Sequence, residues 1–129
     1  MKNKKGFRGY ITSRKIDGSF IPQTLQNLKI RDFAKKLNIE FKLSATEYVM
    51  KNSYHVLNSL KSEVNYLEGV IFFSVFALPE KKKDRNEVLK FFLKKKKILY
   101  FALEELTVKS NSDIADIDDI YFIKKATSK

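Results

Sequence analysis

Hydrophobic positions along the chain alternate between two kinds of spacing. Short runs of clustered apolar residues predict strands over residues 7–12, 39–43, 67–75 and 98–103. Between these runs, apolar residues recur every three or four positions, which predicts helices over residues 23–37, 52–64 and 84–95, and a last helix that begins at Ser112 or Asp113. The run over residues 67–75 has almost no polar interruption, which is typical of a strand covered on both faces.

This alternation of strands and helices predicts an α/β domain. We expect a single open, mostly parallel sheet of four or five strands with helices on both faces. Right-handed crossovers leave few topologies, of which a flavodoxin-like three-layer sandwich is the simplest. A length of 129 residues fits one domain spanning residues 1–129, with frayed ends at residues 1–5 and 125–129.

The fold class predicts where a site would lie. Ligands of open parallel sheets bind at the carboxyl ends of the strands, near the point where the strand order reverses. Polar residues follow each predicted strand, so we expect them to form one pocket for a sugar or nucleotide-sugar. Glu47 and Glu104 are the candidate catalytic residues, as general base or acid. The candidate ligand-binding residues are Arg8, Thr12, Ser13, Arg14, Gln23, Asn27, Ser44, Ser74 and Glu105.

A purely structural interpretation of the same residues stays open. Loop serines more often satisfy nearby backbone amides than bind ligands, and glutamates at strand ends are often solvated. Gln23 and Asn27 lie at the start of the first predicted helix, whose amino end favours an anion, and Arg14 would hold its phosphate or carboxylate.

Composition excludes several kinds of chemistry. The chain has no cysteine and a single histidine, His55, so thiolate and histidine-built metal sites are excluded, and no glycine-rich nucleotide-binding motif is present. We expect no metal and no cofactor. No apolar run is long enough to span a membrane, and none follows the basic N-terminus as in a secretory signal, so the expected location is the cytoplasm.

The net charge of +11 points toward anionic partners. Only four of the 26 cationic residues are Arg and the other 22 are Lys. Because Arg makes most bidentate contacts to phosphates and bases, this balance favours solvated lysines over specific nucleic-acid recognition. The lysine runs at 81–83 and 94–97 are therefore interpreted as a basic rim or as ordinary solvated surface.

Five segments carry a resemblance to a known family, namely residues 6–14 (GFRGYITSR), 21–23 (IPQ), 26–28 (QNL), 43–48 (LSATEY) and 67–71 (LEGVI). They resemble the sporadic carbohydrate cluster protein family of bacteria. Members of that family are associated with gene clusters for surface polysaccharides such as O-antigen. The resemblance implies a cytoplasmic role in making or modifying a glycan and supplies no reaction.

A second resemblance rests on Gly9-Tyr10 in the first predicted strand, residues 23–28 (QTLQNL) and residues 73–78 (FSVFAL). These segments resemble the catalytic domain of serine recombinases, and the resemblance implies the same α/β fold. The chemistry does not carry over, because the Tyr-x-Arg-x-Ser pattern of that family meets Thr12 and Arg14 here. The arginine pair that follows the third strand in the family meets Ala77 and Glu80.

Three functions follow as hypotheses. The first is a protein of surface-polysaccharide biosynthesis that binds or modifies a sugar or nucleotide-sugar. The second is a non-enzymatic partner of a carbohydrate-cluster enzyme. The third is a degenerate resolvase-like nucleic-acid-binding domain without recombinase activity. The sequence leaves open whether the protein is an enzyme, and a homodimer is a further expectation because small open α/β domains often pair.

Overall fold

The computed structural model describes residues 6–47 and 54–127 and contains a single five-stranded sheet. The strand order is β2-β1-β3-β4-β5. β1, β2, β3 and β4 are parallel, and β5 pairs antiparallel with β4. The strands are β1 (Phe7–Thr12), β2 (Phe41–Glu47), β3 (Gly69–Phe72), β4 (Ile98–Phe101) and β5 (Leu106–Val108). The predicted mostly parallel sheet with flavodoxin-like strand order is therefore confirmed.

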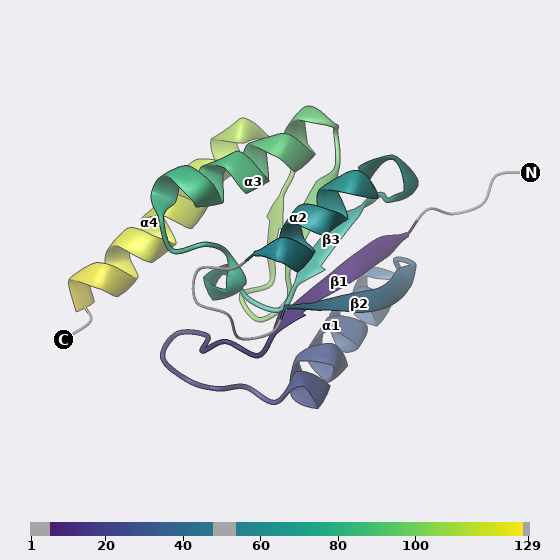
Figure 1. The fold of residues 1–129 in the computed structure, drawn as a ribbon, viewed down its shortest axis with the longest axis horizontal. Coiled ribbons are helices and arrows are strands. Elements are labelled where there is room, and N and C mark those ends of the chain that lie inside the picture. The colour runs from purple at the N-terminus through teal and green to yellow at the C-terminus, as the bar shows by residue number, and fades with distance from the viewer. Residues whose placement is uncertain (1–5, 48–53, 128–129) are drawn as a thin grey trace, which may run out of the picture.

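Helices cover both faces of the sheet unequally (Figure 1). One face carries α1 (Gln23–Leu37) alone, packed through Ile30, Phe33 and Ala34. The other face carries α2 (His55–Ser62), α3 (Lys82–Lys94) and α4 (Asn111–Thr127), and two short 3-10 turns, η1 (Val64–Tyr66) and η2 (Val75–Ala77), lie before and after β3. The predicted three layers are confirmed.

The central strands supply side chains to both cores in alternation. Tyr10 and Phe72 face the three-helix side, with their ring centroids 5.4 Å apart, whereas Ile11 and Ile71 face α1. Because both faces are buried, a near-continuous apolar run is required in β3, which explains the pattern seen over residues 67–75.

The second strand differs from its prediction. β2 starts at Phe41, two residues after the predicted start, and continues to Glu47, four residues beyond the predicted end at residue 43. Parallel pairing with β1 extends to Thr12 opposite Glu47, and the Ser13 amide donates to the Glu47 carbonyl at 2.9 Å. Backbone pairing thus outweighs the polar character of this segment.

Other boundaries moved by a few residues. β3 ends at Phe72, and Ser74 then accepts a hydrogen bond from the Phe76 amide to start η2. β5 was not placed by the sequence pattern, since its three residues are too few to show a period. α4 begins at Asn111 and runs to Thr127, so residues 125–127 of the predicted frayed end are helical. The predicted start of the second helix at residues 52–53 lies outside the described residues.

The Asp113 side chain caps the start of α4. The Asp113 carboxylate accepts from the Ser110 amide at 3.1 Å and from the Lys109 amide at 2.9 Å, which lowers the pKa of Asp113. Within residues 6–47 and 54–127, no helix has the length and apolar character needed to cross a bilayer.

Candidate anion-binding cleft

A cleft of about 870 Å³ lies at the carboxyl edge of the sheet. It is bounded by the loop after β1, by the connection from β3 to α3, by the first turn of α3 and by the second half of α4. The loops after β1 and β3 diverge here because α1 and α3 pack on opposite faces of the sheet. This is the strand-order switch point at which the fold class predicts a ligand.

Cations dominate the lining. Six cationic side chains contribute, which are Lys15, Lys81, Lys82, Arg85, Lys124 and Lys125. Three carboxylates face them, from Asp17, Glu80 and Asp118, and Phe76, Tyr121 and Phe122 add aromatic surface. The excess of three positive charges in a concave surface favours an anionic ligand.

A tight turn brings Asp17 to the cleft. The Ile16 and Ser19 backbones exchange hydrogen bonds of 2.7 and 3.1 Å, and Asp17 and Gly18 between them have φ of 51° and 82°. Positive φ at both central positions is the geometry that Asp-Gly favours. The Asp17 carboxylate forms an ion pair with Lys124, which connects this turn to α4.

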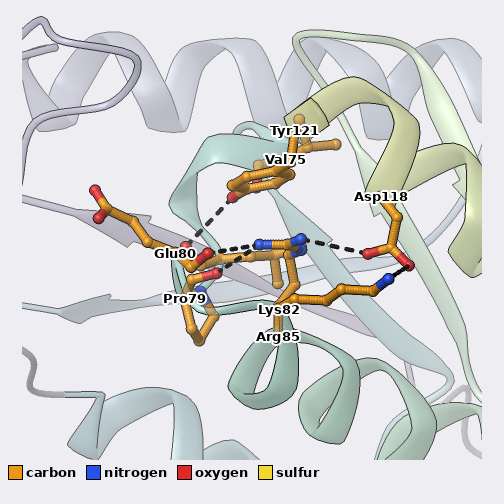
Figure 2. A network of polar contacts seen from close by, with 8 residues as sticks. Val75, Pro79, Glu80, Lys82, Arg85, Asp118 and Tyr121 are labelled. Atoms are coloured by element: carbon orange, nitrogen blue, oxygen red, sulfur yellow. Dashed lines mark hydrogen bonds and ion pairs between the residues drawn. The ribbon is translucent and has the colours of Figure 1, made fainter. Parts of the chain in front are cut away.

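Arg85 is a buried cation at the base of the cleft (Figure 2). Its residue exposure is 3%, and its Nη1 donates to the carbonyls of Pro79 at 3.3 Å and Glu80 at 2.8 Å. The guanidinium carbon lies 3.7 Å from the centroid of the Tyr121 ring. These contacts fix both the β3–α3 connection and the orientation of the guanidinium.

The charge of Arg85 is balanced by Asp118 of α4. Arg85 Nη2 lies 3.3 Å from Asp118 Oδ1, and Lys82 Nζ lies 4.0 Å from Asp118 Oδ2. Arg85 Nε has no hydrogen-bond partner among the residues that the structure describes. Tyr121 donates its hydroxyl to the Val75 carbonyl at 2.5 Å, and burial raises the pKa of Tyr121, so this donor stays protonated.

Glu47, a predicted catalytic residue, is buried away from the cleft at 2% exposure. Its Oε1 accepts from the Tyr10 hydroxyl at 2.9 Å and the Leu57 amide at 3.1 Å, and its Oε2 accepts from the Val56 amide at 3.1 Å. Glu47 therefore anchors the amino end of α2 to the sheet. Burial and the Glu47 carboxylate raise the pKa of Tyr10, which keeps the Tyr10 hydroxyl a donor.

Arg14 lies beside this network at the end of β1. Its Nη2 donates to the Ala77 carbonyl at 3.1 Å and contacts the Tyr10 hydroxyl at 3.4 Å. The guanidinium carbon is 4.2 Å from the centroid of the Tyr54 ring, and burial raises the pKa of Tyr54. Arg14 thus joins β1, η2 and the residue before α2, and it lies outside the cleft lining.

Glu104, the other predicted catalytic residue, holds the turn between β4 and β5. Its carboxylate accepts from the Ser74 hydroxyl at 2.6 Å and the Val75 amide at 3.0 Å, and Ser74 is fully buried. Glu105 is exposed with a φ of 53°, in the same turn. Ser74 and Glu104 thus secure the start of η2.

The predicted residues of β1, β2 and α1 mostly bind one another. Thr12 Oγ1 accepts from the Arg14 amide, the Ser13 amide pairs with β2, and the Ser44 hydroxyl donates to Asn27 at 2.5 Å. Gln23 is partly buried in the first turn of α1.

Arg8 lies away from the carboxyl edge of the sheet. It is the second residue of β1, so it sits toward the amino end of that strand. Its Nε donates to the Leu43 carbonyl at 2.6 Å and its Nη1 pairs with Glu63 at 2.7 Å.

None of the eleven predicted site residues lines the cleft. In retrospect, two sequence features point to the cleft, the Asp17-Gly18 turn signal and the lysine run 81–83 between the third predicted strand and the third predicted helix. No local signal shows that α4 returns to the same edge of the sheet. No group of three or more His, Asp or Glu side chains placed to hold a metal ion occurs within residues 6–47 and 54–127.

Comparison with solved structures identifies the fold. The N-terminal catalytic domain of the TP901-1 integrase superposes with a TM-score of 0.68 at 12% identity, covering 95% of this chain and 99% of that domain. A resolvase family site-specific recombinase from Streptococcus pneumoniae superposes with a TM-score of 0.65 at 13% identity, covering 93% of this chain and 89% of that protein.

No family model and no curated protein matches the sequence. The resemblance to the carbohydrate-cluster family therefore gains no support, whereas the resemblance to recombinase catalytic domains is supported at the level of the fold. At 12–13% identity the likeness concerns architecture alone, and the chain has the α/β fold of resolvase-type catalytic domains.

Proposed function

We propose that this domain binds nucleic acid through phosphate groups held in the cleft, and that it does not act as a recombinase. The observation that carries the proposal is the excess of cationic side chains at the carboxyl edge of a resolvase-like sheet. The two similar structures are an integrase domain and a site-specific recombinase, which supports a nucleic-acid ligand for the shared architecture.

The kinds of residue present favour backbone contacts over base recognition. Five of the six cleft cations are lysines, which bind phosphates as point charges and carry little sequence information. Phe122 is 72% exposed beside them, so it offers a surface on which an unpaired base can stack. Lysines around an exposed aromatic ring favour a single strand over a duplex.

The absence of recombinase activity follows from the recombinase resemblance. Arg14 stands where that family has its nucleophilic serine, and its guanidinium contacts Ala77 and Tyr54. The neighbouring Ser13 pairs through its backbone with Glu47. The cleft is thus proposed to bind its ligand without covalent attack.

Salt-dependent binding of a short fluorescent single strand tests the proposal. We expect affinity to fall with salt between about 50 and 200 mM but to persist at physiological ionic strength. The double variant Lys81→Gln/Lys125→Gln should lower the salt slope by about two, since each lost phosphate contact removes about one.

The matched control is Lys94→Gln/Lys95→Gln, which removes the same charge from the opposite end of α3. Equal losses in the two double variants would show that binding reflects net charge alone. Loss of all binding at physiological salt would overturn the proposal.

A nucleotide-sugar or sugar phosphate is the second candidate ligand. A cavity of about 870 Å³ has the size of small-molecule sites, and Phe76, Tyr121 and Phe122 offer surface to a sugar or base. A cytoplasmic role in surface-polysaccharide biosynthesis, as enzyme or docking partner, rests on the sequence resemblance alone. A thermal-shift panel separates the candidates, because a salt-insensitive shift with one sugar class would favour this second ligand.

A further inference from the structure

We propose that Lys82 and Arg85 form the phosphate subsite of the cleft and that Asp118 occupies this subsite until a ligand displaces it. The inference deepens the proposed function, since it rests on a phosphate-bearing ligand entering the cleft. Asp118 would then be an internal competitor that lowers affinity for weakly charged anions.

Arg85 requires an anion at this position. Its side chain is 4% exposed, and a buried guanidinium without a counter-charge is strongly destabilising. The carbonyls of Pro79 and Glu80 satisfy Nη1, and the Tyr121 ring covers the guanidinium plane. Among the described residues, Asp118 is the carboxylate that pairs with Arg85.

Asp118 fills this position incompletely. Nε and Nη2 form one edge of a guanidinium, the edge that binds two oxygens of an oxyanion side by side. Asp118 contacts only Nη2, and Nε has no partner within the described chain, which is uncommon for a buried donor.

The distances are also longer than a strong ion pair requires. The two contacts of Asp118 measure 3.3 Å to Arg85 and 4.0 Å to Lys82, against about 2.7–2.9 Å for charge-assisted hydrogen bonds. A terminal phosphate group offers three acceptor oxygens, enough for Nε, Nη2 and Lys82 Nζ together, so it matches this set of donors better than a carboxylate does. A phosphodiester of a nucleic-acid backbone offers two non-bridging oxygens, enough for Nε and Nη2.

The subsite is accessible to a ligand. Lys82 is 70% exposed, Asp118 is 21% exposed, and both line the cleft with Arg85 (Figure 2). Asp118 repels an incoming phosphate and has to move away before the phosphate can bind. The free energy that this movement costs weakens the binding of the phosphate. A doubly charged phosphate tolerates this competition better than a monoanion.

Removing the charge of Asp118 tests the inference. With inorganic pyrophosphate and the labelled single strand as probes, Asp118→Asn should bind about tenfold more tightly than wild type, since a like charge no longer opposes the ligand. Without ligand this variant should melt at a lower temperature, because Arg85 loses its counter-charge, and pyrophosphate should restore more of the melting temperature than in wild type. Asp116→Asn, an exposed change of equal charge on α4, is the control.

Lys82→Gln keeps the test decisive if Asp118→Asn does not fold. This exposed substitution should weaken pyrophosphate binding, whereas Lys94→Gln should not. In the double variant Lys82→Gln/Asp118→Asn, it should cancel the gain in affinity from Asp118→Asn. Two results would overturn the subsite and leave the proposed function standing. In the first, wild type binds a probe but Asp118→Asn binds it no more tightly than Asp116→Asn does. In the second, Lys82→Gln binds as tightly as wild type. No binding of either probe to any of the proteins would overturn the proposed function itself.

Discussion

Two buried polar side chains, Glu47 and Gln26, connect the sheet to its helices. The Gln26 amide oxygen accepts from the Thr12 amide at 3.1 Å, and its nitrogen donates to the carbonyls of Thr12 at 2.7 Å and Ile21 at 2.8 Å. Glu47 does the same for α2 on the opposite face. Each of these side chains hydrogen-bonds a strand end to a helix. Much of the carboxyl edge therefore consists of polar side chains whose partners belong to the protein itself.

Glu47→Gln should lower the free energy of unfolding by about 2 kcal/mol. The glutamine amide has one acceptor oxygen in place of two, so it cannot accept from both the Tyr10 hydroxyl and the α2 amides as Glu47 does. It also lacks the negative charge that stabilises the amino end of a helix. Chemical denaturation would show a lower midpoint with an unchanged slope. The exposed Glu87→Gln on α3 loses the same charge and should change stability by less than about 0.5 kcal/mol. Equal effects of the two substitutions would contradict the anchoring role of Glu47.

At the residue scale, the sequence identified polar positions but not their partners. Glu47 and Glu104 were predicted to act on a ligand because they follow strands. In the structure their carboxylates accept from the amides of Val56, Leu57 and Val75 and from the Tyr10 and Ser74 hydroxyls, which the fold of the chain brings near. Conversely, Arg85 and Asp118 are 33 residues apart and meet only because α3 and α4 pack together. The spacing of the two residues in the sequence does not predict this contact.

Among the elements, those with a clear period were predicted best. α1 spans the predicted residues, and Ile30, Phe33 and Ala34 of its apolar set are buried against the sheet. Three leucines of that set are exposed instead, namely Leu25, Leu28 and Leu37. β2 was placed too early because Ser44 and Glu47 give its second half the polarity of a loop, although Ser44 meets Asn27 and Glu47 meets α2. A hydrophobicity pattern does not identify strand residues whose polar side chains are hydrogen-bonded within the fold.

The pairing of β3 with β4 depends on a glycine. A Cβ at Gly69 would overlap the carbonyl oxygen of Ile98 in the facing strand. Gly69→Ala should therefore lower the free energy of unfolding by about 3 kcal/mol, measured by chemical denaturation, since backbone atoms cannot move aside as a side chain can. Gly18→Ala is the control, because its Cβ would meet open space and only the positive φ of 82° costs about 1 kcal/mol. Tolerance of Gly69→Ala would mean that the two strands separate easily.

On the scale of the whole molecule, cationic side chains are spread widely, and six of them line the cleft at the carboxyl edge of the sheet. The net charge of +11 includes the lysine run 94–97 at the far end of α3, which the bland interpretation of solvated lysines describes adequately. The run 81–83 differs, because Lys81 and Lys82 line the cleft beside cations from the β1–α1 loop and from α4. Two similar lysine runs thus have different surroundings because they lie at opposite ends of α3.

Self-repulsion of this net charge should make the free protein more stable as salt is added. Screening at about 0.1 M shortens the reach of each charge to about 10 Å, which weakens repulsion among 26 cations opposed by 15 carboxylates. It also weakens surface ion pairs such as Asp32–Lys36, but such pairs contribute only about 0–1 kcal/mol each. We therefore expect the melting temperature in sodium chloride to rise between low and physiological ionic strength, and to rise less in Lys94→Gln/Lys95→Gln. A falling melting temperature would instead mean that ion pairs such as Asp17–Lys124 and Asp118–Arg85, which connect α4 to the rest of the domain, outweigh the repulsion.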